Sequence, residues 1–78
     1  MITLYTTPEC AQCQVMKRFL EEEEVALGLK DSYCVVNIRE LDEVPDGITT
    51  VPAWDVNGKT EVGMRPRTIV SKWLQDVV

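Results

Sequence analysis

The sequence contains no histidine and only three cysteines among its 78 residues. A structural zinc site needs four ligands, usually cysteine or histidine, so Asp or Glu would have to complete one here, which is uncommon. Three is an odd number, which excludes a framework in which every cysteine is paired. Cys34 lies far from the other two, inside an apolar stretch. Cys10 and Cys13 therefore form an isolated Cys-x-x-Cys motif, which favours redox chemistry over half a zinc site.

The chain also lacks a long apolar run and an excess of positive charge. No run approaches the roughly 20 residues that span a bilayer, and Met1 is not followed by a charged and then apolar signal peptide. Thirteen acidic and eight basic residues give a net charge of -5, which disfavours nucleic acid and anionic membrane surfaces as partners. We therefore expect a cytoplasmic monomer that binds neither nucleic acid nor membrane, and the cytoplasm suits a redox Cys-x-x-Cys.

Length and a hydrophobic content of 45% predict one globular domain over residues 1–78. A strand–helix–strand start implies a parallel pair with a right-handed crossover, and Asn57-Gly58 is a strong signal for an antiparallel hairpin. These features predict an α/β fold with a four-stranded mixed sheet flanked by about three helices. The expected strands are residues 2–5, 33–38, 53–56 and 59–62, and the expected helices are residues 11–27, a weakly supported 39–44, and a last one from Pro66 onward.

Apolar periodicity gives each of the two longer helices one buried face. In the helix at residues 11–27 the apolar positions recur at three-, four- and seven-residue steps, and Gly28 is its natural end. This stripe turns Cys13 toward the core and leaves Cys10 at the exposed end. For Cys34 the strand predicts a buried small hydrophobe, with a regulatory thiol as the alternative. The two apolar faces are Cys13, Met16, Phe19, Leu20 and Leu27, and Ile69, Val70, Trp73, Leu74 and Val77.

Residues 6–13, Thr-Thr-Pro-Glu-Cys-Ala-Gln-Cys, pass from a strand into a helix. Unpaired backbone N–H groups and the helix dipole favour negative charge at a helix start, which lowers the pKa of a thiol there. We therefore expect Cys10 to attack a disulfide and Cys13, one turn further on, to resolve the mixed disulfide. Glu9 opposes the thiolate, so we expect the Cys10 pKa to be only moderately lowered. Thr7 is expected to cap the helix or to place a hydroxyl near the sulfur.

Two features farther along the chain bear on the same site. The basic residues 17–18 lie within two turns of Cys10 and either add modest positive potential or form ion pairs on the helix surface. Residues 50–52, Thr-Val-Pro, stand where a strand begins, a place that tolerates proline. If the Val51–Pro52 bond is cis, the Val51 backbone lies beside Cys10 and pairs with an extended substrate segment. If it is trans, as most such bonds are, Pro52 marks an ordinary strand edge.

Four segments, residues 6–13, 16–18, 50–52 and 63–66, span nearly the whole chain. In this order they resemble the glutaredoxins of the thioredoxin fold, and most of all the NrdH-type redoxins and related phage proteins. The resemblance implies a cis Val51–Pro52 bond, a redox-active Cys10–Cys13 disulfide and no bound cofactor. It also implies thioredoxin reductase as electron donor and a ribonucleotide reductase as acceptor. The substrate contacts that it implies fall on Thr7, Gln12, Thr50, Val51, Pro52, Gly63, Met64 and Arg65.

The sequence also departs from those families. Ala11-Gln12 stands between the cysteines where many glutaredoxins have Pro-Tyr, and this is closer to the NrdH type. Residues 61–66 lack the Gly-Gly and Asp-rich segment that holds glutathione in many glutaredoxins, and they differ from the NrdH Trp-Ser-Gly-Phe-Arg-Pro at three positions. Glutathione is therefore the less expected donor. Two alternatives stay open: a glutathione-dependent glutaredoxin that uses Cys10 alone, and a metal-binding module such as an iron–sulfur-bridged dimer.

Overall fold

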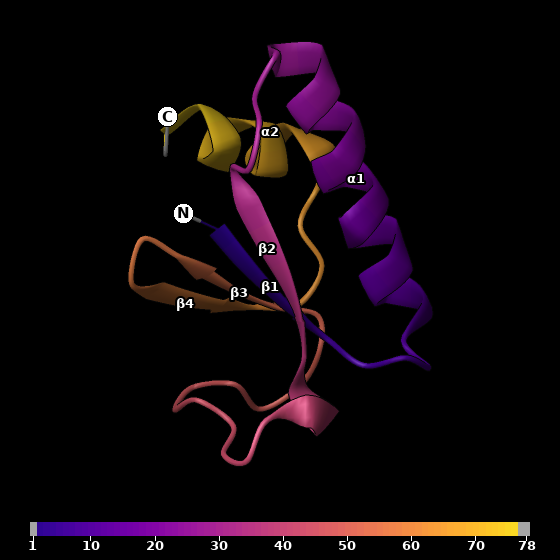
Figure 1. The fold of residues 1–78 in the computed structure, drawn as a ribbon, viewed down its shortest axis with the longest axis vertical. Helices are drawn as coiled ribbons and strands as arrows, with labels where there is room; N and C mark the ends of the chain where they lie inside the picture. Colours follow the sequence, from indigo (N-terminus) through magenta and orange to yellow (C-terminus); the bar gives the residue numbers. More distant parts are fainter. Residues whose placement is uncertain (1, 77–78) are drawn as a thin grey trace.

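A four-stranded mixed sheet with two α-helices forms the fold, as seen in a computed structural model that describes residues 2–76 (Figure 1). The strands lie in the order β2-β1-β3-β4. This agrees with the predicted mixed sheet. The elements along the chain are β1 (Ile2–Thr6), α1 (Ala11–Leu27), β2 (Tyr33–Asn37), the short 3-10 helix η1 (Ile38–Glu40), β3 (Ala53–Val56), β4 (Lys59–Val62) and α2 (Arg67–Asp76).

The strand pairing brings three chain segments to one end of the sheet. β1 and β2 are parallel, with Thr6 opposite Asn37, and β1 and β3 are antiparallel, with Tyr5 opposite Ala53. The carboxyl ends of β1 and β2 therefore meet the amino end of β3. In Figure 1 the segment between β1 and α1 and the η1 turn both lie at the lower end of the molecule.

The hairpin of β3 and β4 follows the expected turn chemistry. Asn57 and Gly58 join β3 to β4 and both have positive φ, 51° and 90°. A two-residue type I′ turn requires positive φ at both of its central positions, and Asn-Gly adopts it most readily.

Both helices cover the same face of the sheet. Ile2 and Leu4 of β1 and Trp54 of β3 are fully buried in one cluster with residues of both helices, and α1 contacts α2 directly. The Trp54 ring meets the Trp73 ring edge-on, with centroids 5.1 Å apart, a geometry that aromatic pairs favour. The helical members of the cluster are Met16, Leu20, Val70 and Leu74.

Helix α1 begins and ends at the predicted residues. Gly28 caps it in the left-handed conformation, with φ of 70°, which glycine adopts without steric cost. Two members of the predicted stripe are less buried than expected: Phe19 is half-buried, and Leu27 is exposed in the last turn, with 36% of its surface accessible. Arg67 of α2 connects the two helices. Its guanidinium forms ion pairs with Glu22 and Glu23 of α1 and lies over the Phe19 ring.

The helix expected at residues 39–44 is wrong, and the described residues contain two α-helices rather than about three. Only Ile38–Glu40 winds, as the 3-10 turn η1, and Leu41 is already extended with ψ of 141°. Six residues before Pro45 are too few to offset the cost of starting a helix. The Asn37 side chain instead accepts a hydrogen bond from Arg39 N–H at 3.0 Å, which stabilises a single turn.

The expectation of a buried Cys34 is also wrong, because its thiol is free and exposed. β2 lies at the edge of the sheet. Cys34 lies opposite Thr3, and therefore on the sheet face turned away from Ile2, Leu4 and the helices. Residue type alone does not reveal which face of a strand is covered.

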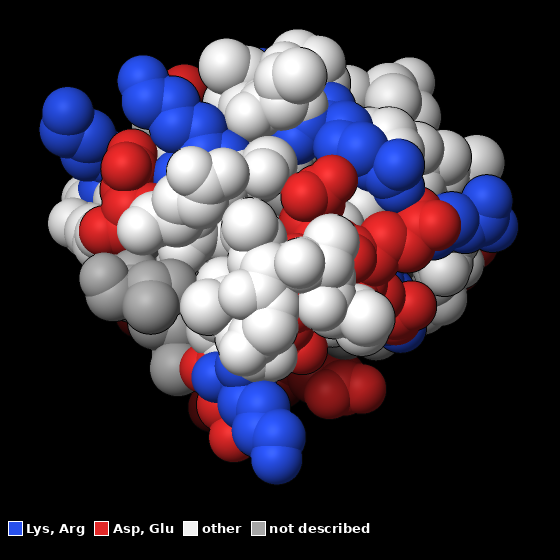
Figure 2. All heavy atoms as spheres, turned by 90° about the horizontal axis from the view of Figure 1, so that it is seen from above, with Lys and Arg blue, Asp and Glu red and all other residues white. Residues whose placement is uncertain are grey.

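The remaining expectations concern a membrane span, Val77 and the surface charge. Within residues 2–76, no helix is long and apolar enough to cross a bilayer. Val77, expected on the apolar face of α2, lies outside the described residues. In the view from above, Lys and Arg side chains lie beside Asp and Glu side chains (Figure 2), so the charge on that face is mixed in sign.

The position of Leu20 and Leu27 on one helix allows a matched test of this packing. Leu20→Ala removes a fully buried side chain and is expected to lower the free energy of unfolding by about 2–5 kcal/mol. Leu27→Ala is expected to cost about 1 kcal/mol or less, because its side chain is already partly in water. Urea unfolding followed by circular dichroism measures both. Equal losses would contradict the described burial of α1.

Candidate active site

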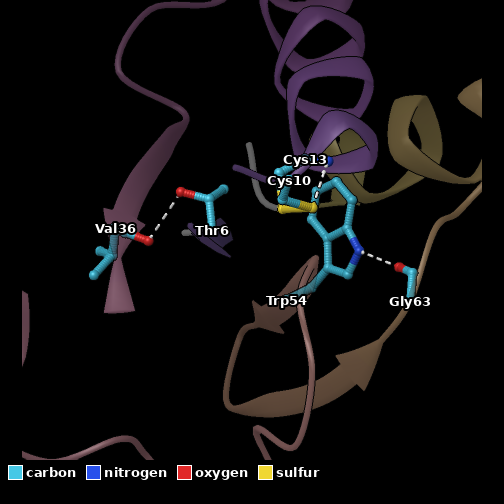
Figure 3. The surroundings of a disulfide bond; sticks show 6 residues. All are labelled: Thr6, Cys10, Cys13, Val36, Trp54 and Gly63. Atoms are coloured by element: carbon cyan, nitrogen blue, oxygen red, sulfur yellow. Dashed lines mark hydrogen bonds between the residues drawn. A yellow bond between two sulfur atoms is a disulfide. The ribbon is translucent and has the colours of Figure 1, made fainter. Parts of the chain in front are cut away.

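Cys10 and Cys13 form a disulfide at the start of α1, with Cα atoms 5.2 Å apart (Figure 3). Cys10 is itself the N-cap of the helix, with φ of −88° and ψ of 106°. Its Sγ accepts a hydrogen bond from the backbone N–H of Cys13 at 3.1 Å. An N-cap residue normally accepts this bond through a Ser, Thr, Asp or Asn oxygen. Here the sulfur itself occupies the position where a helix favours negative charge.

The two sulfurs differ in their access to solvent, as the helical stripe predicted. Cys13 is 1% exposed and belongs to the buried face of α1, whereas Cys10 is half-buried at the surface. An incoming disulfide therefore reaches Cys10 first. Cys13 is held behind it, within bonding distance, by the first turn of the helix.

Thr7 does not cap α1 as expected, because Cys10 takes that place. The contribution of Thr7 is its backbone carbonyl, which accepts a hydrogen bond from Cys10 N–H at 3.3 Å. This bond turns the chain from β1 toward the helix. The motif therefore caps itself through Cys10.

The Val51–Pro52 peptide bond is cis, which the residues left open and the family resemblance implied. Pro52 is buried and directly precedes Ala53, the partner of Tyr5 in β1. Gly63 N–H donates to the Pro52 carbonyl at 2.8 Å, and the Gly63 carbonyl accepts from Trp54 Nε1–H at 3.0 Å. Figure 3 shows Trp54 and Gly63 on one side of the disulfide and Thr6 and Val36 on the other.

The segment after Gly63 reaches α1 one turn beyond Cys13. The backbone N–H of Arg65 lies 3.4 Å from Met16 Sδ. The Arg65 guanidinium is bound by the Glu61 carboxylate at 3.0 Å and by the Met64 carbonyl at 3.0 Å. The structure thus brings residues 63–65 beside both Pro52 and α1, while the Arg65 charge is already paired.

The remaining predicted contact residues lie at the surface around this core. Met64 is an exposed large hydrophobic side chain, 44% accessible. Gln12 and Thr50 are exposed, and Val51 is half-buried. The Gln12, Thr50 and Met64 side chains are therefore accessible to a partner.

One charged residue of the site was not predicted. Arg39 of η1 forms an ion pair with Glu9, the residue just before Cys10. Because β1 and β2 are parallel, the residues that follow β2 lie next to those that follow β1. The predicted parallel pairing could therefore have placed Arg39 near Glu9. The pair offsets the carboxylate that was expected to oppose the Cys10 thiolate.

The ionisable group with a shifted pKa in the described part of the chain lies away from the disulfide. Among residues 2–76, no group of three or more His, Cys, Asp or Glu side chains is arranged to hold a metal ion. Burial, followed by the nearby carboxylates of Glu24 and Glu21, raises the pKa of Tyr33 above its ordinary value. Tyr33 pairs with Ile2 at the other end of β1, so this shift does not involve the site.

Comparison with solved structures shows a thioredoxin-like fold. The crystal structure of the thioredoxin-like protein BC3987 is 18% identical, with a TM-score of 0.65 and full coverage of both chains. A mutant of that protein is 16% identical, with a TM-score of 0.66, covering 88% of this chain and 93% of the other. At this identity the likeness concerns the fold. The sequence matches no protein-family model and no curated protein.

The ion pair between Arg39 and Glu9 makes a testable contribution to the reactivity of Cys10. In reduced protein carrying Cys34→Ser, Arg39→Gln is expected to raise the Cys10 pKa, because the Glu9 carboxylate loses its counter-charge. Alkylation of Cys10 by iodoacetamide at pH 7 should slow about two- to threefold, the scale of an exposed ion pair.

Glu9→Gln is the matched control and should shift the pKa in the opposite direction. The double variant should return close to the starting protein. The pH dependence of the alkylation rate, followed by mass spectrometry, gives all four values. An unchanged pKa in Arg39→Gln would show that the pair does not act on the thiol.

Proposed function

We propose that this protein is a dithiol–disulfide oxidoreductase that carries electrons to a protein disulfide. The observation that supports this most is the N-cap geometry, in which Cys10 Sγ accepts the Cys13 N–H at 3.1 Å while Cys13 is buried behind it. A backbone N–H directed at a sulfur stabilises its thiolate, which is the attacking species in disulfide exchange. The thioredoxin-like fold is a common setting for such a Cys-x-x-Cys pair.

The exchange proceeds in two steps. The Cys10 thiolate attacks one sulfur of the target disulfide, and the other target sulfur leaves as a thiolate that takes a proton from water. The Cys13 thiol loses its proton and attacks Cys10 Sγ, which releases the second target sulfur. The target gains two electrons, and the protein is left with the Cys10–Cys13 disulfide seen in the structure. A separate reductase must restore the dithiol.

The cis peptide end of β3 is the place where the target chain would lie. The Val51 backbone precedes Pro52 at the start of β3, beside the segment that leads from β1 to Cys10. An extended target segment would pair with Val51 as an added strand does. Met64 supplies an exposed apolar side chain at the edge of this surface, and Gln12 and Thr50 complete it.

Within this class, the four segments that resemble known redoxins favour an NrdH-type redoxin, which has a glutaredoxin-like sequence. Thioredoxin reductase is then the electron donor and a ribonucleotide reductase the acceptor. Arg65, which stands near the expected glutathione region, is already paired with Glu61. This pairing leaves one cation fewer for a glutathione carboxylate and supports the reductase as donor.

The roles of the two cysteines give a direct test. Cys10→Ser and Cys13→Ser are each expected to lower the rate of insulin disulfide reduction by about 100-fold or more, since they remove the two reacting groups. Cys13→Ser alone should accumulate a mixed disulfide, visible by non-reducing electrophoresis and mass spectrometry. Cys34→Ser should keep the full rate. A mixed disulfide on Cys13 in the Cys10→Ser protein would reverse the assignment.

The electron donor is tested separately. Thioredoxin reductase with NADPH is expected to reduce the Cys10–Cys13 disulfide, and glutathione with glutathione reductase is expected to do so far more slowly. NADPH oxidation at 340 nm measures both. Fast turnover with glutathione that persists in Cys13→Ser would instead establish the glutathione-dependent alternative, in which Cys10 acts alone.

A further inference from the structure

An open groove of about 370 Å³ lies on the β2 side of the active-site segment. This is within the range of small-molecule sites, roughly 300 to 1,000 Å³. Residues 6–8, which lead to Cys10, form one wall, and Gln14 and Lys17 of α1 form the second. The third wall is the end of β2, with Val35 and Asn37, and Glu40 of η1. The groove is separate from the Pro52–Gly63 side, where the proposed target segment lies.

The groove is connected to the reacting sulfur through Thr7. Thr7 lines the groove, and its carbonyl accepts the Cys10 backbone N–H at 3.3 Å. Lys17 lies two turns after Cys10 on α1, and helical side chains tilt toward the N-terminus of their helix. Cys10, Gln14 and Lys17 are spaced at i, i+4 and i+7, so the groove wall formed by Gln14 and Lys17 follows the helix face that begins at Cys10.

Two opposite charges face this groove from different elements. Lys17 comes from α1 and Glu40 from η1, and within residues 2–76 neither of them takes part in an ion pair. The Asn37 amide oxygen already accepts a bond from Arg39 N–H, which leaves its NH₂ group as a donor. The groove thus offers the Lys17 cation on the α1 wall, and an amide donor and a carboxylate, from Asn37 and Glu40, on the wall formed by β2 and η1.

We propose that this groove binds the α-amino-acid group of a low-molecular-weight disulfide. Lys17, with Asn37 or Gln14, would bind the carboxylate of that group, and Glu40 would bind its ammonium. A group with only one charge would leave either Lys17 or Glu40 unpaired. The proposal rests on thiol–disulfide exchange at Cys10 and adds a class of substrate to it.

With cystine the chemistry balances as follows. The Cys10 thiolate attacks one cystine sulfur, the cystine S–S bond breaks, and one cysteine leaves and takes a proton from water. The amino-acid group of the half still bound to Cys10 occupies the groove. Cys13 loses its proton, attacks Cys10 Sγ and releases the second cysteine. Two electrons pass from the Cys10–Cys13 dithiol to cystine.

The test compares disulfides that differ only in their charged groups. Protein carrying Cys34→Ser is reduced with dithiothreitol, desalted and mixed in single turnovers with cystine, cystamine, 3,3′-dithiodipropionate or glutathione disulfide. Lys17→Met should slow the reaction with cystine and dithiodipropionate about three- to tenfold but leave cystamine unchanged. Glu40→Gln should slow cystine and cystamine by a similar factor and leave dithiodipropionate unchanged.

The same rate measurements include two control variants, and they show which part of the disulfide carries the bound amino-acid group. Lys72→Met and Glu43→Gln remove exposed charges elsewhere and should alter none of the four reactions. Charge dependence with cystine places the amino-acid group next to the sulfur, and charge dependence with glutathione disulfide places it at the distant γ-glutamyl end. Loss of rate that is equal for all four disulfides, or no loss for any, would overturn the groove as a binding site.

A binding measurement separates this proposal from the proposed function. S-Methylcysteine carries the same amino-acid group but cannot exchange. NMR titration of the oxidised protein with this compound should shift the amide signals of Lys17, Asn37 and Glu40, and Lys17→Met should remove the shifts. If insulin is not reduced but these shifts appear, the proposed function fails and the groove stands. If insulin is reduced and no shifts appear, the groove fails alone.

Discussion

At the start of α1, a sulfur atom accepts the hydrogen bond that an oxygen accepts in most helices. Cys10 Sγ lies 3.1 Å from the N–H of Cys13, and the remainder of the molecule holds these two residues in place. β1 fixes where the chain leaves the sheet, and the Thr7 carbonyl turns it into the helix. The buried face of α1 then fixes the rotation of the helix, so that Cys13 is covered and Cys10 is not. The proposed roles of Cys10 as attacking thiol and Cys13 as resolving thiol depend on this one junction.

The order of strands in the sheet determines what surrounds the junction. Because β1 is central, it has the parallel strand β2 on one side and the antiparallel strand β3 on the other. The β3 side contributes Pro52 and, through its hydrogen bond, Gly63. The β2 side contributes Arg39, which pairs with Glu9, and one wall of a polar groove. A single redox pair is thereby placed between two chemically different surfaces, one with backbone and apolar groups and one with charges.

Much of this arrangement could be predicted from local sequence patterns. The stripe of α1, the Gly28 end and the Asn57-Gly58 hairpin each depend on interactions between residues close in sequence, and the structure has all three, except that Leu27 is exposed. The mixed sheet was predicted from the order of the elements and is also present. The asymmetry between Cys10 and Cys13 followed from the same helical period. The cis bond before Pro52 did not follow from the residues, because most such bonds are trans. It was expected only from the resemblance of the segments to known redoxins.

The errors at Cys34 and on the β2 side come from tertiary placement, whereas the error at residues 39–44 has a local cause. Cys34 was expected to be buried because of its apolar neighbours, but the sheet order makes β2 an edge strand and turns the thiol to solvent. Residues 39–44 were expected to form a helix, but Pro45 and the Asn37 cap leave only one turn. Arg39 and the groove were missed because their importance arises from the parallel pairing of β1 with β2. Local patterns indicate which elements form, and the pairing decides which surfaces they share.

The central claim is that the Cys10–Cys13 disulfide exchanges reversibly and is not a structural staple. A redox titration of the Cys34→Ser protein in dithiothreitol buffers, with thiols counted by alkylation and mass spectrometry, tests this most directly. Stabilisation of the Cys10 thiolate predicts one two-electron transition between about −180 and −270 mV, the range of protein disulfide isomerase, glutaredoxins and thioredoxin. A midpoint below about −300 mV, where structural disulfides lie, would contradict the account.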